Sequence, residues 1–443
     1  MIDYRPLAPN EFDAFFDNLD LAFHERSTPA KRAQLLALIP LERTVAAFDG
    51  PLLVGTSAAF PQRLSVPGGE LPCAGVTVIT VRPTHRRRGL LTQMMAGLIE
   101  QARAAREPLA GLWAAEGSIY ERFGYGVASR HAHIVLPGGS RAPRPSLAAD
   151  VAKRGTAAGD ARTSAAPRDG HLTLDLIDPD GAGPLLDPIW DRMRARRAGI
   201  PARTQLWWSE RILADPEDDR DGALEKRLVV VRGAGPPGGS GAAGADPASE
   251  DTSEPLGYAL YRARGIEPDT TLELLELVAP DPEAEALLWE YLCSVDLVGM
   301  VDAPMRPLDD AAPYRFADFR QPRVVELGDA LWLRLVDLPA ALQGRSWRGP
   351  LDLTLDVADV RLPDNAGRWR LQATADGEAR CARTDKPADL VLDAAALGAA
   401  YLGGTPIAQL ADAGRIAERT DGAVEAFDTA LRTPRAPWTP EFF

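Results

Sequence analysis

One continuous stretch, from Val76 to Met95, constrains the fold of this chain more than any other part of its sequence. It reads Val-Thr-Val-Ile-Thr-Val-Arg-Pro-Thr-His-Arg-Arg-Arg-Gly-Leu-Leu-Thr-Gln-Met-Met. The β-branched residues at its start favour a strand, and Pro83 with Thr84 favours a turn. Apolar residues then recur with a helical period over Leu90–Glu100. The pattern predicts a strand, a basic turn and an amphipathic helix in succession, which is typical of an α/β domain.

The basic turn, Arg86-Arg87-Arg88-Gly89, is a candidate anion site because it precedes a helix. The first N–H groups of a helix lack partners within it, and the helix dipole makes that end positive. Gly89 lets the backbone approach a ligand closely, and arginines add charge and paired donors. The chain contains neither a P-loop sequence nor a G-x-G-x-x-G after a strand. From the residues alone, the turn is either a polyanion site suited to a pyrophosphate or a solvated basic turn.

A second motif, Ser118-Ile-Tyr-Glu-Arg-Phe-Gly-Tyr125, follows a predicted strand at Leu109–Ala114. We expect a short helix over Ser118–Phe123 that ends at Gly124, since glycine tolerates the left-handed conformation of a C-cap. Tyr120 lies in the first turn of this helix. A tyrosine suits proton donation because its pKa of about 10 keeps it protonated at neutral pH. A core aromatic is the alternative interpretation of the same pattern.

Together the two motifs resemble those of the GCN5-related N-acetyltransferases (GNAT). The acyl-CoA loop of that family follows [QR]-x-x-G-x-[GA], and Arg86, Gly89 and Leu91 stand at its three marked positions. Leu91 departs from the usual small residue. The departure is expected in the enhanced-intracellular-survival (Eis) aminoglycoside acetyltransferases, whose loop is similar to Arg-Arg-Arg-Gly-Leu-Leu. The second motif resembles the family's Y-x-x-x-G-[FY], and in outline the resemblance covers the whole chain, to Phe443.

The resemblance implies transfer of an acetyl group from acetyl-CoA to an amine of a polycationic acceptor, an aminoglycoside or a lysine-like amine. Transfer is expected to be direct, in a ternary complex, with no metal. The implied general acid is Tyr120, and the implied general base is the α-carboxylate of Phe443. The implied acetyl-CoA site combines backbone groups of the strand with the basic turn and the first helical turn: Ile79, Thr80, Val81, Arg86, Arg87, Arg88, Gly89, Leu90, Leu91 and Thr92.

The last residues, Thr439-Pro-Glu-Phe-Phe443, carry an expectation of their own. Burial of a phenylalanine side chain stabilises by about 1.5–3 kcal/mol, enough to dock a chain end. Pro437 and Pro440 lower the entropy lost on docking. We therefore expect Phe442 and Phe443 to be buried. The alternative to a catalytic carboxylate is that the two rings only anchor the tail.

Stretches rich in Gly, Pro and small polar residues divide the 443-residue chain. We interpret 137–170 as a linker or mobile loop and 232–255 as a disordered loop inside a domain. Strand and helix patterns alternate on both sides of the linker. The expected fold is α/β (α+β) with three domains, at 1–136, 171–315 and 316–443. The resemblance implies an active GNAT domain, a second GNAT-like domain without activity, a domain like sterol carrier protein, and a homohexamer.

Charge and hydropathy argue against several classes of protein. The 49 Lys and Arg against 63 Asp and Glu give a net charge of −14, which disfavours nucleic acid as the main partner and suits a cationic ligand. The mean hydropathy is −0.16, and no apolar run approaches the roughly 18–20 residues of a membrane span. Neither a signal peptide nor a disulfide or metal spacing among the three cysteines is visible, so we expect a cytoplasmic protein; export without a signal stays open.

Several polar residues have two interpretations. His131 and His133 alternate on one face of a strand and suit a metal, but without a third ligand at usable spacing a surface pair is favoured. Asp20, Glu25 and Glu116 are either cation contacts or, more simply, exposed acids.

The rival to an enzyme is a non-catalytic lipid-carrier or interaction protein with a vestigial CoA loop. The resemblance of the last domain to sterol carrier protein motivates this rival. The complete Arg-Arg-Arg-Gly turn and Tyr120 favour the enzyme, because a decaying site is not expected to keep both.

Overall fold

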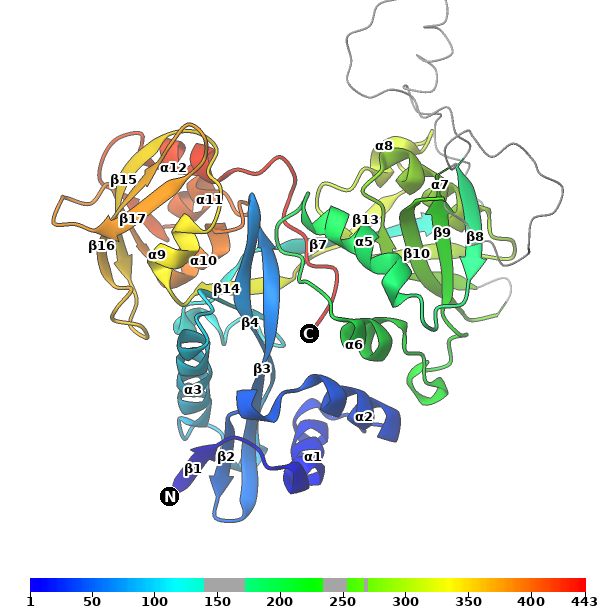
Figure 1. The fold of residues 1–443 in the computed structure, drawn as a ribbon, viewed down its shortest axis with the longest axis horizontal. Helices are drawn as coiled ribbons and strands as arrows, with labels where there is room; N and C mark the ends of the chain where they lie inside the picture. The colour runs from blue at the N-terminus through cyan, green and yellow to red at the C-terminus, as the bar shows by residue number, and fades with distance from the viewer. Residues whose placement is uncertain (139–171, 234–252, 267–269) are drawn as a thin grey trace, which may run out of the picture.

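The computed structural model describes residues 1–138, 172–233, 253–266 and 270–443, and three β-sheets organise them (Figure 1). Two sheets have seven strands and the third has five. Most of the predicted linker at 137–170 and most of the predicted loop at 232–255 lie outside the described residues. None of the helices in these ranges is long and apolar enough to cross a membrane.

The first sheet contains both sequence motifs. Its strands, in spatial order, are β1 (Ile2–Arg5), β2 (Ala46–Asp49), β3 (Leu52–Val66), β4 (Gly69–Val81), β5 (Leu109–Trp113), β14 (Leu331–Leu335) and β6 (Gly126–Val127). Its helices are α1 (Phe12–Phe23), α2 (Pro29–Leu38) and α3 (Leu90–Ala104), with 3-10 turns η1 (Pro9–Glu11), η2 (Leu41–Arg43), η3 (Pro83–His85) and η4 (Glu121–Phe123). The helix expected from Leu90 is confirmed, and its buried residues follow the predicted period.

The second sheet has the strand order β13 (Arg323–Asp329), β7 (Arg130–Pro137), β12 (Met300–Pro307), β11 (Thr271–Val278), β10 (Pro255–Arg264), β9 (Arg227–Arg232) and β8 (Thr173–Ile177). Its helical segments are α5 (Gly183–Arg194), α6 (Gln205–Trp207), the π-helix η5 (Trp208–Leu213), η6 (Glu217–Asp219), α7 (Pro282–Ser294) and α8 (Ala312–Arg315).

The third sheet has the order β17 (Ala379–Arg383), β16 (Gly367–Ala373), β15 (Leu351–Ala358), β18 (Leu390–Asp393) and β19 (Ile416–Glu418). Its helices are α9 (Leu338–Gln343), α10 (Ala394–Ala400), α11 (Ile407–Asp412) and α12 (Ala423–Leu431). We call the part of the chain from residue 338 onward, up to the tail that begins at 436, the third domain. The α/β (α+β) fold class expected from the sequence is confirmed.

The sheets exchange strands. The strand β14 inserts between β5 and β6 of the first sheet and is antiparallel to both. Conversely, β7 directly follows β6 of the first sheet in the chain but pairs with β12 and β13 of the second sheet. The sheets therefore do not follow the domain boundaries that the sequence predicts at residues 136 and 315. Most of β7 precedes the first boundary yet belongs to the second sheet, and β13 and β14 follow the second boundary yet belong to the second and first sheets. A strand pattern reports burial along one segment and carries no information about which sheet the segment joins.

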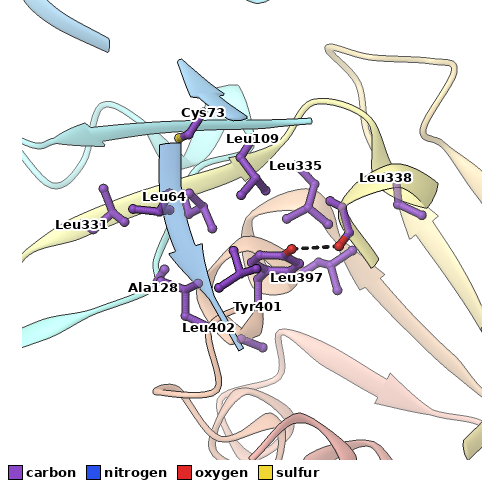
Figure 2. Packing of buried hydrophobic residues seen from close by; sticks show 14 of the residues in the cluster. Leu64, Cys73, Leu109, Ala128, Leu331, Leu335, Leu338, Leu397, Tyr401 and Leu402 are labelled. Carbon is purple, nitrogen blue, oxygen red and sulfur yellow. Dashed lines mark hydrogen bonds between the residues drawn. The ribbon is translucent and has the colours of Figure 1, made fainter. Parts of the chain in front are cut away.

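The inserted strand joins the first sheet to the third domain through a shared core (Figure 2). Leu331 and Leu335 of β14 pack in one buried cluster with Leu64 of β3 and Leu397 of α10 (Figure 2). At the same place the Tyr401 hydroxyl donates to the carbonyl of Ala341 at 2.8 Å. The position of the third domain on the first sheet is thus set by continuous apolar packing.

Candidate active site

The strands β4 and β5 separate part-way along their length. Their parallel pairing covers only 73–76 of β4 and 109–112 of β5. Beyond it, β4 carries a bulge, because Thr77 to Thr80 lies opposite only Ala58 to Thr56 of β3. Val78 adopts a φ of +48°, which a β-branched residue rarely does. A bulge bends its strand, so the end of β4 turns away from β5, and the two strands are not paired beyond that point.

A buried hydrogen-bond network holds the bulge. The Thr56 hydroxyl donates to the Val78 carbonyl at 2.8 Å and lies 2.6 Å from the Thr80 hydroxyl. The Asn18 amide of α1 donates to that same Thr80 hydroxyl at 2.6 Å. The Thr80 side chain is therefore engaged inside the protein.

The basic turn has the geometry of an anion site. Gly89 caps α3 with a φ of +82°, which favours glycine, and a Cβ added there meets no atom within 4 Å. Open space at a helix N-terminus leaves room for a ligand close to the backbone. Arg86 and Arg87 are exposed and form no ion pair with any described residue. Arg88 differs, because its guanidinium lies 3.5 Å from the Asp49 carboxylate.

Tyr120 precedes the 3-10 turn η4. The expected helix over Ser118–Phe123 is wrong in extent: only Glu121–Phe123 is helical, and it is a 3-10 turn. Gly124 ends it with a φ of +83°, as predicted for a cap. The segment is too short for an α-helix because the N–H groups of Phe123 and Tyr125 both donate to the Tyr120 carbonyl, which closes the turn at once.

The side chain of Tyr120 connects the two motifs. It is only 6% exposed and belongs to the same buried cluster as Leu90, the first residue of α3. Burial, and secondarily the nearby Glu116 carboxylate, raise the pKa of Tyr120, so the hydroxyl keeps its proton at neutral pH. The neighbouring Tyr125 is fully buried, and its hydroxyl is enclosed without a partner among the described residues. Of the two tyrosines, Tyr120 is the better placed to reach a ligand.

A cavity of about 500 Å³ lies beside the bulge and is lined by α1, α2, η5 and the tail. Thr77 and Val78 of β4 contribute to its wall. Aromatic rings from α1, β3, α6 and the tail line it: Phe16, Phe23, Phe60, Trp207 and Phe443. Five acids and four bases complete the lining: Asp20, Glu25, Glu210, Asp215 and Asp219, with Lys31, Arg211, Lys226 and Arg262.

Two charged groups of this cavity are tuned by their surroundings. Although burial acts in the opposite direction, hydrogen bonds from Ser27 and the ion pair with Arg32 lower the pKa of Asp20. Burial lowers the pKa of Lys226 to about 8, and its ammonium donates to the carbonyls of Ile212 and Ala214 at 2.8 and 2.6 Å. Of the acids singled out in the sequence, Asp20 and Glu25 line the cavity and Glu116 does not.

The tail runs beside the second sheet and ends near α6 (Figure 1), and its last residue, Phe443, lines this cavity. The Trp438 indole donates to the Met305 carbonyl at 2.8 Å, and the Thr439 hydroxyl donates to the Gly199 carbonyl at 2.7 Å. Phe443 is buried as expected, at 9% exposure, but Phe442 is 53% exposed. The expected burial of Phe442 is therefore wrong. Its ring rests on Trp113 at the end of β5, with 4.0 Å between ring centroids, but about half of the side chain stays exposed.

A buried arginine holds the tail just before its end. Arg203 donates to one oxygen of Glu441 at 3.1 and 2.8 Å and to Glu276 of β11 at 3.0 and 2.6 Å. Its guanidinium also stacks on the rings of Trp190 and Trp208. One residue from the chain end, the carbonyl of Phe442 accepts from Arg211 at 3.2 Å. Sequence reasoning missed this network because Arg203 and Glu441 stand 238 positions apart.

Two parallel strands of the second sheet also separate, but there protein groups fill the positions that are open in the first sheet. β11 and β12 pair only over 271–273 and 300–302. In the place of a basic turn, α7 begins with Asp281, whose carboxylate accepts from the N–H groups of Glu283 and Ala284 at 2.8 and 3.0 Å. Arg306 reaches from β12 to the Leu277 carbonyl of β11 at 2.8 Å. Protein groups thus occupy the helix N-terminus and cross the gap.

The histidine pair of β7 lies in the second sheet. His133 forms a hydrogen bond with the carboxylate of Asp302 on the neighbouring strand β12. Across the described ranges, no group of three or more His, Cys, Asp or Glu side chains is arranged to hold a metal ion.

Comparisons with known proteins agree with this geometry. Models described as acetyltransferase (GNAT) domain match residues 3–128 and 248–335, and a sterol carrier protein domain model matches 338–440. A Streptomyces avermitilis protein named "Uncharacterized N-acetyltransferase" is 35% identical over all of this chain and 99% of its own. The N-acetyltransferase Eis of Mycobacterium tuberculosis is 31% identical over 89% of this chain and 88% of its own. The chain belongs to the Eis family of GNAT N-acetyltransferases.

The structure of Eis1 from Mycobacterium abscessus superposes on the whole chain with a TM-score of 0.79 and 28% identity, and both chains are fully covered. Family membership confirms the architecture expected from the sequence, with two GNAT-like domains followed by a domain like sterol carrier protein. It also confirms that this Eis-family protein is an N-acetyltransferase.

Proposed function

We propose that this Eis-family enzyme transfers the acetyl group of acetyl-CoA directly to an amine of a polycationic acceptor, an aminoglycoside or a lysine-like amine. One observation carries the proposal. A single cavity, lined by five acids and several aromatic rings, meets both the bulged end of β4 and the end of the chain. Acetyl donor, acceptor and terminal carboxylate can therefore meet in one place.

Acetyl-CoA is assigned to the separated strands and to the N-terminus of α3. The backbone of Ile79, Thr80 and Val81 lies on the part of β4 that is not paired with β5 and can hydrogen-bond the pantetheine arm. The amides from Arg86 to Thr92 can hold the pyrophosphate. Among the arginines, Arg86 and Arg87 are free of ion pairs within the described chain and can reach phosphates, whereas Arg88 is shared with Asp49.

The acceptor is assigned to the cavity. The lowered pKa of Asp20 keeps its carboxylate charged at neutral pH, and a charged carboxylate attracts an ammonium group. The aromatic rings in the cavity wall can offer cation–π contacts to an amine, except Phe16, whose ring already faces the Arg32 guanidinium. The four bases in the wall restrict where positive groups can lie, so amines several bonds apart are expected to bind in a defined orientation. The lipid-carrier alternative is not favoured, since the relatives are N-acetyltransferases.

The chemical step needs an acid and a base on opposite sides of the reacting amine. The α-carboxylate of Phe443 accepts a proton from the acceptor ammonium, directly or through water. The neutral amine attacks the thioester carbon, the carbon–sulfur bond breaks, and Tyr120 donates its proton to the departing thiolate. The raised pKa of Tyr120 supports this role because the proton is present throughout the neutral range. An N–H of β4 is proposed to stabilise the oxyanion.

The second GNAT-like domain is proposed to be inactive. The Asp281 carboxylate already satisfies the helix amides that a pyrophosphate requires, and Arg306 crosses the gap between its strands. Each chain then carries one acetyl-transfer site, within residues 1–136 and closed by the tail of 316–443.

A homohexamer in the cytoplasm is the proposed assembly and location. The edge strand β13 supports self-association, because Val324, Val325 and Leu327 are 48%, 53% and 63% exposed. An edge strand with apolar side chains on both faces is a poor surface to leave in water.

A thiol-release assay tests the proposed function. The purified protein is given acetyl-CoA and, in separate reactions, an aminoglycoside, a linear polyamine, a lysine amide and a neutral monoamine, and the mass of each product is recorded. Release with the polycations and weak or no release with the monoamine is expected. Equal activity on the monoamine would contradict the assignment of the acidic cavity.

A further inference from the structure

The 3-10 turn η4, which follows Tyr120, is held by residues that lie about 200 or more positions later in the chain. Three arginines that follow residue 330 contact three consecutive residues of η4. Arg415 donates to the Glu121 carboxylate at 3.1 Å, and Arg361 donates to the Arg122 carbonyl at 3.4 Å. The third, Arg334 of β14, donates to the Phe123 carbonyl.

Arg334 differs from the other two because it is completely buried. Its exposure is 0%, and its guanidinium forms two hydrogen bonds with Asp359, at 2.9 and 2.8 Å. Arg361 is exposed and Arg415 is partly exposed, so each contributes little. A buried pair is different, since removal of one partner leaves an uncompensated charge. Of the three arginines, Arg334 therefore forms the strongest interaction with the turn.

The turn itself is shaped to admit this arginine. A Cβ added to Gly124 would lie 1.7 Å from the Arg334 guanidinium, so no side chain fits there. A Cβ on Gly126 would lie 2.0 Å from the Ala395 carbonyl of α10. Gly124 thus lets Arg334 of β14 approach the backbone directly, and Gly126 does the same for α10 of the third domain.

A short path leads from Arg334 to Tyr120. Arg334 fixes the Phe123 carbonyl, and the N–H of Phe123 donates to the Tyr120 carbonyl at 2.9 Å. Trp332 lies two residues before Arg334 on β14, so both side chains point to the same face of the sheet. Trp332 belongs to the buried cluster that contains Tyr120.

We propose that Asp359 of the third domain, by fixing Arg334 of the inserted strand β14, holds the turn that follows Tyr120 in its reactive position. Arg334 is then a positioning residue for acetyl transfer, and the sterol-carrier-like domain acts in catalysis without binding lipid for that purpose. The inference rests on the proposed function in one respect, the assignment of Tyr120 as general acid.

The test replaces the buried pair by apolar residues of similar size, Arg334→Met with Asp359→Leu. Such replacements leave no charge unpaired, but Asp359→Leu also removes the acceptor of the Arg361 and Leu362 N–H groups, so the folded state of the variant is checked first. The double variant loses the donor to Phe123, and displacement of a catalytic group by about 1 Å costs up to about 10²-fold in rate. We expect kcat to fall about 10- to 100-fold, while KM and Kd for acetyl-CoA stay within about two-fold.

Two further readouts separate positioning from general loss of structure. A loosened turn exposes the Tyr120 hydroxyl, so the alkaline limb of the kcat profile is expected to move to lower pH. In a Tyr120→Phe background, the same double substitution is expected to change kcat by less than about two-fold, because both changes remove one function. Asp359→Asn, which keeps the side-chain shape, replaces the double variant if the latter does not fold.

The matched control is Arg370→Met with Asp352→Leu. That pair joins two strands of the same domain at 2.8 and 2.5 Å, but both residues are solvent-accessible and neither touches the turn. It is expected to leave kcat unchanged. A folded Arg334→Met, Asp359→Leu enzyme with unchanged kcat would overturn the inference, as would an equal loss in the Tyr120→Phe background. Failure of the proposed acid is seen separately, as full turnover by Tyr120→Phe alone.

Discussion

Glu441→Gln tests whether the Arg203 network docks the tail. One carboxylate oxygen of Glu441 accepts from Arg203 twice, at 3.1 and 2.8 Å, and from the Trp207 indole at 3.2 Å. Glutamine keeps the shape and an acceptor but removes the charge, and hydrogen bonds to charged groups are about twice as strong as neutral ones. Arg203 keeps its two bonds to Glu276, so the fold is expected to survive.

The expected loss follows from these contacts. Removal of the charge-assisted component costs about 1.5–3 kcal/mol of docking free energy. Since every 1.4 kcal/mol is about tenfold, the undocked fraction of the tail rises by about 10- to 150-fold. Carboxypeptidase measures that fraction directly, because it releases Phe443 only from an undocked tail and its rate follows the open population when closing is fast.

The predicted outcome is a roughly 10- to 150-fold faster release of phenylalanine from Glu441→Gln, the factor that corresponds to the lost docking free energy. The fall in kcat is expected to match the undocked fraction. Asp352→Asn, in an exposed ion pair with Arg370, is the control and is expected to release phenylalanine at the wild-type rate. Wild-type release from Glu441→Gln would refute the argument that Arg203 fixes the terminal residues.

Three other predictions concern the acetyl-CoA site, the acid and the base. Arg87→Ala is expected to raise the Kd for CoA in titration calorimetry by about one to two orders of magnitude, and unchanged binding in both Arg86→Ala and Arg87→Ala would contradict the phosphate assignment. Tyr120→Phe is expected to slow single-turnover transfer by about 10²–10⁴-fold with nearly unchanged CoA affinity; full turnover there, with loss in Tyr125→Phe, would point to the other tyrosine. One glycine added after Phe443 keeps both rings but moves the carboxylate by up to about 3.5 Å, so kcat is expected to drop, and a fully active extended enzyme would exclude the carboxylate as base.

Features that depend on a few consecutive residues could be predicted from the sequence. The start of α3 follows from the apolar period at Leu90, and the cap at Gly124 follows from the freedom of glycine at positive φ. The short extent of the helix after Tyr120 could not be predicted, because the residue pattern does not show that the N–H groups of Phe123 and Tyr125 both donate to the Tyr120 carbonyl.

Features that depend on pairs of residues far apart in the chain could not be predicted from the sequence. Nothing in the pattern of 331–335 distinguishes a strand of the third domain from one inserted into the first sheet. The cavity is lined by parts as far apart in the chain as Phe16, Trp207 and Phe443, so its acids could not be told from solvated surface acids. Phe442 shows the limit of a burial argument, since an apolar residue at a chain end can rest on one ring and stay half exposed.

The order of chemical events tests the central claim of direct transfer within a ternary complex. The enzyme is mixed rapidly with acetyl-CoA, with or without a polycationic amine, quenched at intervals, and the masses of protein and acceptor are recorded beside free thiol. All three cysteines are buried, and burial raises the pKa of the Cys293 thiol to about 11, which disfavours a thiolate nucleophile. The account predicts thiol release only when both substrates are present, in step with acetylated acceptor and with no acetylated protein. A burst of thiol without acceptor, matched by one acetyl group on the protein, would contradict it.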